Sequence, residues 1–399
     1  MASKGPDGRS SIARSVKGGW EGWVSMGTDP ATGKRLRRHV RAQTKAEVSR
    51  KVAQLEAQRA AGQVAGRRWL VRDWVTAWVA AQRRKVRPST LRGYRPDLAR
   101  LVGMLGERRM DQVGPADIEA LYAAAHDSGL SSGGVAHLHR TVAACFAAAE
   151  RQGVLGRSPL RQVRAPTAEP PEVVPLSVAE VRQVLAAAAG TRNAARWSVA
   201  LALGLRQGEA LGLCWSDVDL EAGALTVRRQ LQWRTWSHGC AGACGRGLAG
   251  RCPRRHGGGP VLTSPKSRAG RRSMVLPAPL VAELRAHAAA QVAERDRLGD
   301  LWCSEWDLVF PAPGGGPGRP EADRRAWGRL LDEAGVPYRR LHDARHTAAT
   351  LLLVQGVAPA VAMTLLGHTD LGVTRRYQHV VDELRRDAAE RMGEAVWGR

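Results

Sequence analysis

A proline-rich segment near the middle of the chain is the feature that most constrains its fold. Pro166, Pro170 and Pro171 fall within six residues, and Pro175 follows them. Proline fixes one backbone angle and has no N–H to donate, so this stretch cannot continue a helix and is typical of a semi-rigid joint. At 399 residues, the chain is also too long for one ordinary core. We therefore predict a linker at residues 166–176 between separately folded parts.

The beginning of the chain, residues 1–66, has the pattern of a short sheet followed by a helix. Apolar residues around Trp23 alternate with polar ones, and a turn-rich stretch leads into a second such run. This alternation is typical of a β-hairpin. Thr44, followed three residues later by Glu47, predicts a capped helix after the hairpin.

Residues 67–165 carry apolar side chains at helical spacing, as at Trp74 and Trp78, and predict a wholly helical domain. Basic residues gather on the hairpin and around the start of the second helix of this domain: Arg35, Arg37, Arg38, Arg41, Lys85, Arg87, Arg92 and Arg95. Such groups either bind DNA phosphates or form a solvated charged surface, and the sequence leaves both interpretations open.

After the linker, residues 177–399 predict a mostly helical domain whose first helix is capped by Ser177. Three short apolar runs predict one small sheet, at 225–231, 261–264 and 274–276. A glycine-rich insert at about 233–260 interrupts it. The expected fold class is therefore mainly α with small β-sheets, an α+β arrangement.

The charge balance favours a polyanionic partner. The chain has 61 Lys and Arg against 37 Asp and Glu, a formal net charge of +24. Neutralising phosphates releases counterions, but an arginine-rich composition, or a ribosome-associated or heparin-binding protein, gives similar numbers. No apolar run approaches the roughly 18 residues that span a bilayer. The N-terminus also lacks a secretory pattern, so we expect a cytoplasmic protein with reduced cysteines and no membrane partner.

Six residues of the last domain supply groups suited to phosphodiester transfer without a metal. They are Arg206, Lys266, His342, Arg345, His368 and Tyr377. A pentavalent phosphorus develops charge on its oxygens, and an arginine fork neutralises two of them at once. An attacking phenol must lose a proton, and the leaving oxygen must gain one. Each residue alone is ordinarily a solvated or satisfied polar group, so the prediction depends on the combination.

The combination resembles the tyrosine recombinase, or phage integrase, family. The motifs stand in the family's order: an arginine box at 203–210, a lysine between strands, His-x-x-Arg, and Leu-Gly-His followed by Thr-x-x-Tyr-x-His. One departure is Leu203, where the family often has threonine, and this should affect packing more than chemistry. The resemblance covers nearly the whole chain. It implies an arm-site-binding-like domain at 1–66, a helical core-binding domain at 67–165, and a tyrosine-recombinase-like catalytic domain at 177–399.

The resemblance also implies how the phosphate is attacked and held. Tyr377 would be the nucleophile and would form a 3′-phosphotyrosyl link, while Arg206 and Arg345 would clamp the scissile phosphate. The covalent link conserves the energy of the phosphodiester, so neither ATP nor a metal cofactor is required.

The remaining roles follow from the same resemblance. Lys266 would protonate the leaving oxygen, His342 would act as a base toward the tyrosine, and His368 would bind the phosphate. Glu209 would support the neighbouring arginine, and His379 would be structural.

The resemblance further implies the partners. Four protomers would bind two double-stranded DNA attachment sites and exchange strands through a Holliday junction, integrating or excising a mobile element. A host DNA-bending protein and an excision factor are candidate accessory partners. The residues after Tyr377, including Met392, Val396 and Trp397, predict a helix that docks on a neighbouring protomer.

Three alternatives remain. A type IB topoisomerase uses similar groups, but the Leu-Gly-His motif and the position of Tyr377 near the end of the chain favour a recombinase. A Xer-like resolvase typically lacks the N-terminal unit. A non-catalytic DNA-binding regulator on the same fold would not need all six residues.

The insert offers a candidate structural zinc site. Cys240, Cys244, Cys252 and His256 follow the spacing Cys-x3-Cys-x7-Cys-x3-His, which supplies four ligands for a tetrahedral ion. The alternative is a flexible basic loop with reduced thiols. The remaining cysteines have apolar surroundings and are expected in the core: Cys145, Cys214 and Cys303.

Overall fold

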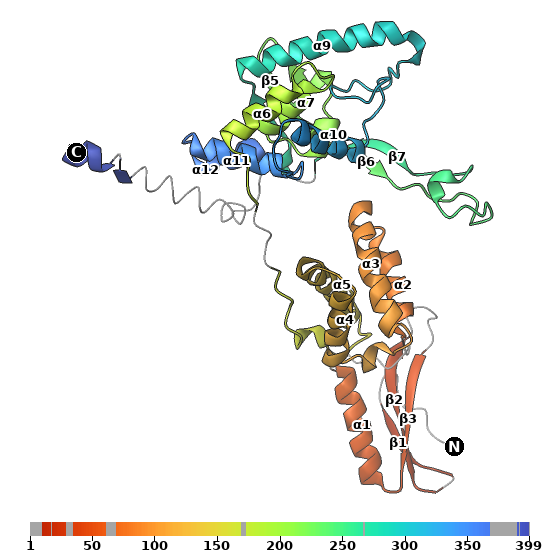
Figure 1. Cartoon of the computed structure of the whole chain (residues 1–399). Coiled ribbons are helices and arrows are strands. Elements are labelled where there is room, and N and C mark those ends of the chain that lie inside the picture. The colour runs from red at the N-terminus through yellow and green to blue at the C-terminus, as the bar shows by residue number, and fades with distance from the viewer. Residues whose placement is uncertain are drawn as a thin grey trace. The chain divides into compact units, whose positions relative to one another are not determined.

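The computed structural model describes residues 10–16, 18–28, 35–60, 69–168, 173–265, 268–367, 389–390 and 392–398. The chain forms two compact units, Met1–Pro171 and Glu172–Arg399 (Figure 1). The division falls inside the proline-rich segment 166–176. Small sheets accompany many helices, which confirms the predicted fold class. Among the described residues, no helix has both the length and the apolar character that crossing a bilayer requires.

The first unit begins with a three-stranded antiparallel sheet and one helix. The strands β1 (Ser11–Arg14), β2 (Trp20–Thr28) and β3 (Arg35–Ala42) pair in chain order, and the helix α1 (Lys45–Ala60) follows them. The predicted helix cap is confirmed, because the Glu47 backbone N–H donates to the Thr44 hydroxyl at 3.3 Å. The sequence does not predict β1, because its four residues have no alternating apolar pattern and are mostly exposed.

The two faces of this sheet differ in chemistry. Val24 is fully buried and packs with Val48 and Val52 of α1. On the opposite face, Trp23 lies across from His39, and the two rings stack with centroids 4.2 Å apart. Arg37 and Arg41 occupy alternate positions of β3 beside His39 and are exposed. Glu21 of β2 pairs with His39 and Arg41 on the same face, so the face is open to solvent with a small excess of positive charge.

The rest of the first unit is helical, as predicted. Its helices are α2 (Val71–Gln82), α3 (Pro88–Leu105), α4 (Pro115–Asp127) and α5 (Ser132–Arg151), with short 3-10 turns η1 (Met110–Gln112) and η2 (Pro159–Arg161). Trp74 and Trp78 are buried in a core that all four helices share. Basic residues around the start of α3 are exposed: Lys85, Arg87, Arg92 and Arg95.

The second unit is built mainly from helices around three buried apolar clusters. The described helices are α6 (Val178–Ala188), α7 (Ala194–Ala202), α8 (Gln207–Leu211), α9 (Ala278–Leu298), α10 (Pro320–Glu333), α11 (Asp343–Val354) and α12 (Pro359–Leu366). The predicted start of α6 is confirmed by reciprocal caps: Glu180 N–H donates to the Ser177 hydroxyl at 3.2 Å, and Ser177 N–H donates to the Glu180 carboxylate at 2.7 Å.

The prediction of one small sheet in this unit is wrong, because the strands form two ladders. One contains β4 (Val218–Asp219), β5 (Ala224–Val227) and β8 (Arg272–Val275); the other pairs β6 (Gln230–Arg234) with β7 (Gly259–Thr263). Two residues, Arg228 and Arg229, separate β5 from β6, whereas the returning chain crosses residues 264–271 between β7 and β8. Because the connection between β7 and β8 is longer than the one between β5 and β6, the strands cannot keep one continuous hairpin register.

Because β6 pairs with β7, the insert between them lies at the end of this two-stranded ladder. The β6–β7 pair extends away from the helices, and the insert forms its far tip (Figure 1). Lys266 was expected at the tip of a hairpin between its two flanking strands. Those strands, β7 and β8, pair with β6 and β5 rather than with each other. Lys266 itself lies outside the described residues.

Candidate active site

Arg206 lies in the turn between α7 and α8, as the sequence predicts. Its backbone N–H and its Nη1 both donate to the carboxylate of Glu209, at 3.0 and 2.7 Å. The arginine side chain remains 38% exposed, so solvent reaches the guanidinium. The turn also needs Gly204, which has a φ of +59°, because a Cβ there would lie 2.6 Å from Leu366 of α12.

Three arginines meet at the carboxyl end of α12. The carbonyls of residues 365–367 each accept a hydrogen bond from a different guanidinium. The donors, in that order, are Arg272 at 2.6 Å, Arg345, and Arg206 at 3.1 Å. The last carbonyls of a helix lack intrahelical partners and carry partial negative charge, so cations suit this end. We call these three arginines, Glu209 and the carbonyls of residues 365–367 the arginine corner.

Glu209 joins two of these arginines from a buried position. Its carboxylate pairs with Arg206 on one side and with Arg272, at 3.0 Å, on the other, and its side chain is 2% exposed. Burial acts to raise the pKa of Glu209, but the adjacent guanidiniums of Arg272 and Arg206 outweigh it and hold the pKa below its usual range. The carboxylate is therefore charged and fixes the orientation of both arginines. This contact confirms the expected support of Arg206 by Glu209.

Arg345 and His342 approach the corner from α11. Arg345 is 3% exposed, and its Nη1 donates to the carbonyl of Gly204 at 2.8 Å, in the same turn that carries Arg206. His342 stands at the N-cap of α11. Partial burial, followed by the charge of Arg345, lowers the pKa of His342, and Arg206 acts in the same direction. The neutral imidazole, which can accept a proton, is thus favoured.

The described part of the chain contains three of the six predicted catalytic residues and brings them together. These are Arg206, His342 and Arg345. The others lie outside the described residues: Lys266, His368 and Tyr377, together with His379. His368 directly follows Gly367, whose carbonyl binds Arg206.

Arg272 is the residue of the corner that sequence analysis misses. Its partners, Glu209 and Leu365, are 63 and 93 positions away, so no local pattern contains them. The sequence offers one signal: Arg272 lies two positions before Met274, the first residue of a predicted strand, so in extended backbone they share one face, and the structure buries that face. An arginine at a core position of a strand must have buried partners.

The structure corrects the predicted zinc ligands in the insert. Cys240, Cys244 and Cys252 lie together, but the fourth group near them belongs to His238 rather than to His256. His256 forms a backbone bridge with Ser237, and its side chain is exposed. The His238 Nδ1, in contrast, lies 3.7 Å from Cys240 Sγ and 3.5 Å from Cys244 Sγ. We call His238, Cys240, Cys244 and Cys252 the thiol cluster.

Of the cysteines expected in the core, Cys145 and Cys214 are buried, and Cys303 is partly buried.

Comparison with known proteins identifies the family. The phage integrase family pattern matches residues 278–383. An integrase of Saccharopolyspora erythraea is 38% identical over 434 aligned positions, which cover 99% of this chain and 98% of the relative. The chain belongs to the phage integrase family. It is a tyrosine-type site-specific DNA recombinase, as the motifs predict.

Other members of the family and solved structures agree with this assignment. A XerC-like tyrosine recombinase of Caldanaerobacter subterraneus subsp. tengcongensis is 27% identical, over 69% of this chain and 70% of that protein. The integrase of transposon Tn1549, solved with transposon right end DNA, superposes with a TM-score of 0.62 at 20% identity, over 82% of this chain and 99% of that one. A lambda integrase tetramer bound to a Holliday junction gives 0.53 at 15% identity, over 94% and 96%. At these identities, the two structures establish the fold of this integrase.

Proposed function

We propose that this integrase cleaves and rejoins double-stranded DNA attachment sites through a 3′-phosphotyrosyl intermediate on Tyr377, and so integrates and excises a mobile element. The observation that carries the proposal is the arginine corner. It holds Arg206 and Arg345 against one short segment, next to the position of His368 in the sequence. Rigid cationic donors of this kind neutralise the charge that develops on phosphate oxygens during transfer.

In this scheme, Arg206 is the guanidinium that reaches the phosphate first. Glu209 holds one of its nitrogens, and the carbonyl of Gly367 holds another, yet the side chain remains partly exposed. Arg345 is buried behind it and binds two carbonyls. It contributes positive charge from behind and shifts toward the phosphate when DNA completes the site.

The remaining roles concern protons and the second histidine. His342, whose lowered pKa favours the neutral ring, accepts the proton of the Tyr377 phenol. Lys266 donates a proton to the leaving 5′ oxygen, and His368 hydrogen-bonds the phosphate. The arginines supply the charge neutralisation that a metal ion supplies in other phosphoryl-transfer enzymes, so the proposed reaction needs no metal cofactor.

We assign DNA contacts of the first unit to two exposed basic surfaces. One is the open face of the N-terminal sheet, where Arg37, His39 and Arg41 lie beside Trp23. The other surrounds the start of α3. Short sheets can enter a DNA groove, and helix starts bind backbone phosphates. The predicted division into an arm-site-binding domain (1–66), a core-binding domain (67–165) and a catalytic domain (177–399) is part of this proposal.

We further propose that four protomers act together in the cytoplasm and exchange strands through a Holliday junction, as the solved lambda integrase tetramer suggests. A host DNA-bending protein and an excision factor are accessory partners in this scheme. Near the end of the chain, Met392, Val396 and Trp397 are helical and 61%, 58% and 72% exposed. An exposed apolar face of this kind fits a helix that docks on a neighbouring protomer.

The test is trapping of the covalent intermediate. The purified integrase is incubated with a nicked suicide substrate that carries the attachment core of its element, in the presence of EDTA. We expect a covalent protein–DNA adduct from the wild type and none from Tyr377→Phe. The exposed Tyr338 provides a matched control, and Tyr338→Phe should form the adduct normally.

A negative result is also informative. Tight binding to the attachment core without any adduct would contradict the proposed mechanism and favour a DNA-binding regulator on the same fold. An adduct that persists in Tyr377→Phe would place the nucleophile elsewhere in the chain.

A further inference from the structure

The insert contains little that would order it by apolar packing. All of residues 235–258 are described, and within this range only Cys240 and Cys252 are buried, at 6% and 2% exposure. Trp236, the large aromatic residue of this range, is partly exposed and lies against Gly258 and the guanidinium of Arg255. Free thiols are ordinarily buried among other apolar side chains. Here the two best-buried residues are thiols in a glycine-rich loop, which requires another explanation.

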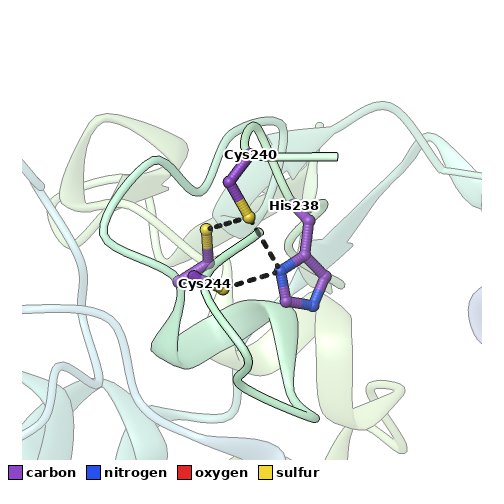
Figure 2. Close-up of side chains that lie close together, drawn as sticks. His238, Cys240 and Cys244 are labelled. Carbon is purple, nitrogen blue, oxygen red and sulfur yellow. Dashed lines mark hydrogen bonds between the residues drawn. The ribbon is translucent and has the colours of Figure 1, made fainter. Parts of the chain in front are cut away.

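Three of the distances within the thiol cluster match those around a tetrahedral ion, and all four ligand atoms lie within 4.8 Å of one another. His238 Nδ1 lies 3.7 Å from Cys240 Sγ and 3.5 Å from Cys244 Sγ, and Cys252 Sγ lies 3.5 Å from Cys240 Sγ. Figure 2 shows the His238 ring directed toward the sulfurs of Cys240 and Cys244. Zinc holds sulfur at about 2.3 Å and nitrogen at about 2.0 Å, which places tetrahedral ligands about 3.5 to 3.8 Å apart.

The backbone between the ligands is shaped to bring them together. Ala241 and Gly242 have φ values of +49° and +93°, and the N–H of Ala243 donates to the carbonyl of Cys240 at 2.9 Å. This tight turn places Cys244 beside Cys240. A non-glycine residue at positive φ, such as Ala241, costs free energy. A favourable interaction of the Cys240 and Cys244 thiols must therefore offset the cost of forming this turn.

We propose that His238, Cys240, Cys244 and Cys252 bind one structural Zn²⁺, which folds the insert at the tip of the β6–β7 hairpin. Three soft sulfur ligands and one imidazole form a closed tetrahedral set of the kind that structural zinc sites use. A disulfide does not explain the cluster, because Cys240 and Cys252 are 3.5 Å apart, whereas bonded sulfurs lie about 2.05 Å apart.

The ion gives the insert a role in DNA binding, an extension that depends on the proposed function above. Five arginines lie in the insert and its flanking residues: Arg234, Arg246, Arg251, Arg254 and Arg255. The sequence contains no acidic residue between Glu221 and Glu283. A folded loop with this charge presents fixed cations to a phosphate backbone, whereas an unfolded loop must lose conformational entropy to do so.

Zinc content measured on the full-length protein tests the site directly. We expect about one zinc per chain by elemental analysis after purification without chelators. Cys244→Ser and His238→Ala should lower the content several-fold. His256→Ala and Cys303→Ser are matched controls, since these side chains lie outside the cluster, and both should retain zinc. Replacement of zinc by Co²⁺ should give the visible absorption of a tetrahedral thiolate complex, and Cys244→Ser should lose it.

Several outcomes would overturn the site. Wild-type protein that takes up neither Zn²⁺ nor Co²⁺ after full reduction would do so, as would a disulfide between Cys240 and Cys252 found in the natively purified chain. Loss of zinc from His256→Ala, with retention in His238→Ala, would restore the ligand set that the sequence suggested. Circular dichroism of each variant shows whether a low zinc content reflects an unfolded protein.

The DNA role is tested separately from catalysis. Binding to the nicked attachment core is measured across a salt series for the zinc-loaded wild type and for Cys244→Ser. Each lost phosphate contact should reduce the salt slope by about 0.9. An unchanged slope in a variant without zinc would remove the DNA role and leave the metal site intact. The Tyr377 adduct assay, run at saturating DNA so that weaker binding does not limit it, reports on the proposed reaction independently, so the failure of one proposal does not imply the failure of the other.

Discussion

The arginine corner and the thiol cluster achieve their geometry by different means. In the corner, the buried Glu209 carboxylate and the carbonyls of residues 365–367 hold the guanidiniums, and apolar clusters surround them. In the thiol cluster, four ligand atoms converge within a loop that has little apolar packing. The arginine corner is therefore held by groups of the chain itself, whereas the insert, under the zinc proposal, depends on a bound ion for its geometry.

The largest effect is expected from breaking the corner at Glu209. Glu209→Gln keeps the shape but removes the charge that faces the buried Arg272. Loss of one partner from a buried pair costs about 3–5 kcal/mol. We expect a fall of this size in the free energy of unfolding, measured by denaturant titration, together with loss of the covalent adduct.

Glu221 provides the matched control for this substitution. Its side chain is 92% exposed and pairs with the half-exposed Arg285. Glu221→Gln should change the free energy of unfolding by less than about 1 kcal/mol, because exposed pairs contribute little. Equal effects of the two substitutions would show that the corner is not a buried electrostatic unit.

A smaller loss of stability is expected from substituting Gly367, the residue that ends α12. Gly367 has a φ of +66°, and a Cβ there would lie 2.7 Å from the carbonyl oxygen of Ala269. Gly367→Ala therefore adds a steric clash to backbone strain, and we expect it to destabilise the protein by about 1–3 kcal/mol. Thermal unfolding measures the change.

Gly356 serves as a control that distinguishes the effect of the steric clash from the effect of backbone strain. It has a φ of +79°, and a Cβ at this position would meet no atom within 4 Å. Gly356→Ala should cost less than Gly367→Ala, because it introduces strain alone. If both variants unfold alike, close packing at the end of α12 does not determine the stability of the corner.

The pH dependence of stability gives a finer test of the corner. The pKa of His342 is lowered in the folded protein, so the unfolded chain binds a proton more readily than the folded one. Stability is therefore unaffected by this group above the usual histidine pKa of about 6.5 and decreases as the pH falls from there toward the folded value.

The variant His342→Gln should lose this contribution. Denaturant unfolding at a series of pH values between about 7 and 5 should show a shallower decline in the variant than in the wild type. Identical slopes would mean that the folded protein does not lower the pKa of His342, either by burial or through the neighbouring arginines.

The smallest effect is expected from removing metal. After chelation, the second unit should keep its unfolding midpoint, because its apolar clusters contain no residue of the insert. Limited proteolysis should then cut within residues 235–258 before any other site of the second unit. Resistance of this range after verified loss of zinc would mean that the insert orders itself.

Local signals in the sequence predicted much of the fold. Thr44 and Ser177 mark the starts of α1 and α6 because a cap involves residues only three positions apart. Helical periodicity similarly predicted the helices of the first unit. The split of the sheet was not predictable in this way, because it depends on the unequal chain lengths on the two sides of the broken hairpin.

The sequence predicts the site residues that belong to the family motifs, but not those outside them. Arg206, His342 and Arg345 were found by motif and lie together. Arg272 was missed because its partners are distant in sequence. His238 was missed in favour of His256 because spacing alone does not reveal which histidine pairs through its backbone and which one faces the thiols.

Adduct formation by zinc-depleted wild-type protein on the nicked attachment core, with the DNA concentration raised to saturation, separates the chemistry of the arginine corner from the proposed zinc site. We expect the Tyr377 adduct to form at saturation, because the proposed roles of the arginine corner involve no ion, although more DNA is required to reach saturation. Absence of the adduct at saturating DNA, with recovery on adding zinc, would contradict the claim that the arginine corner acts without an ion.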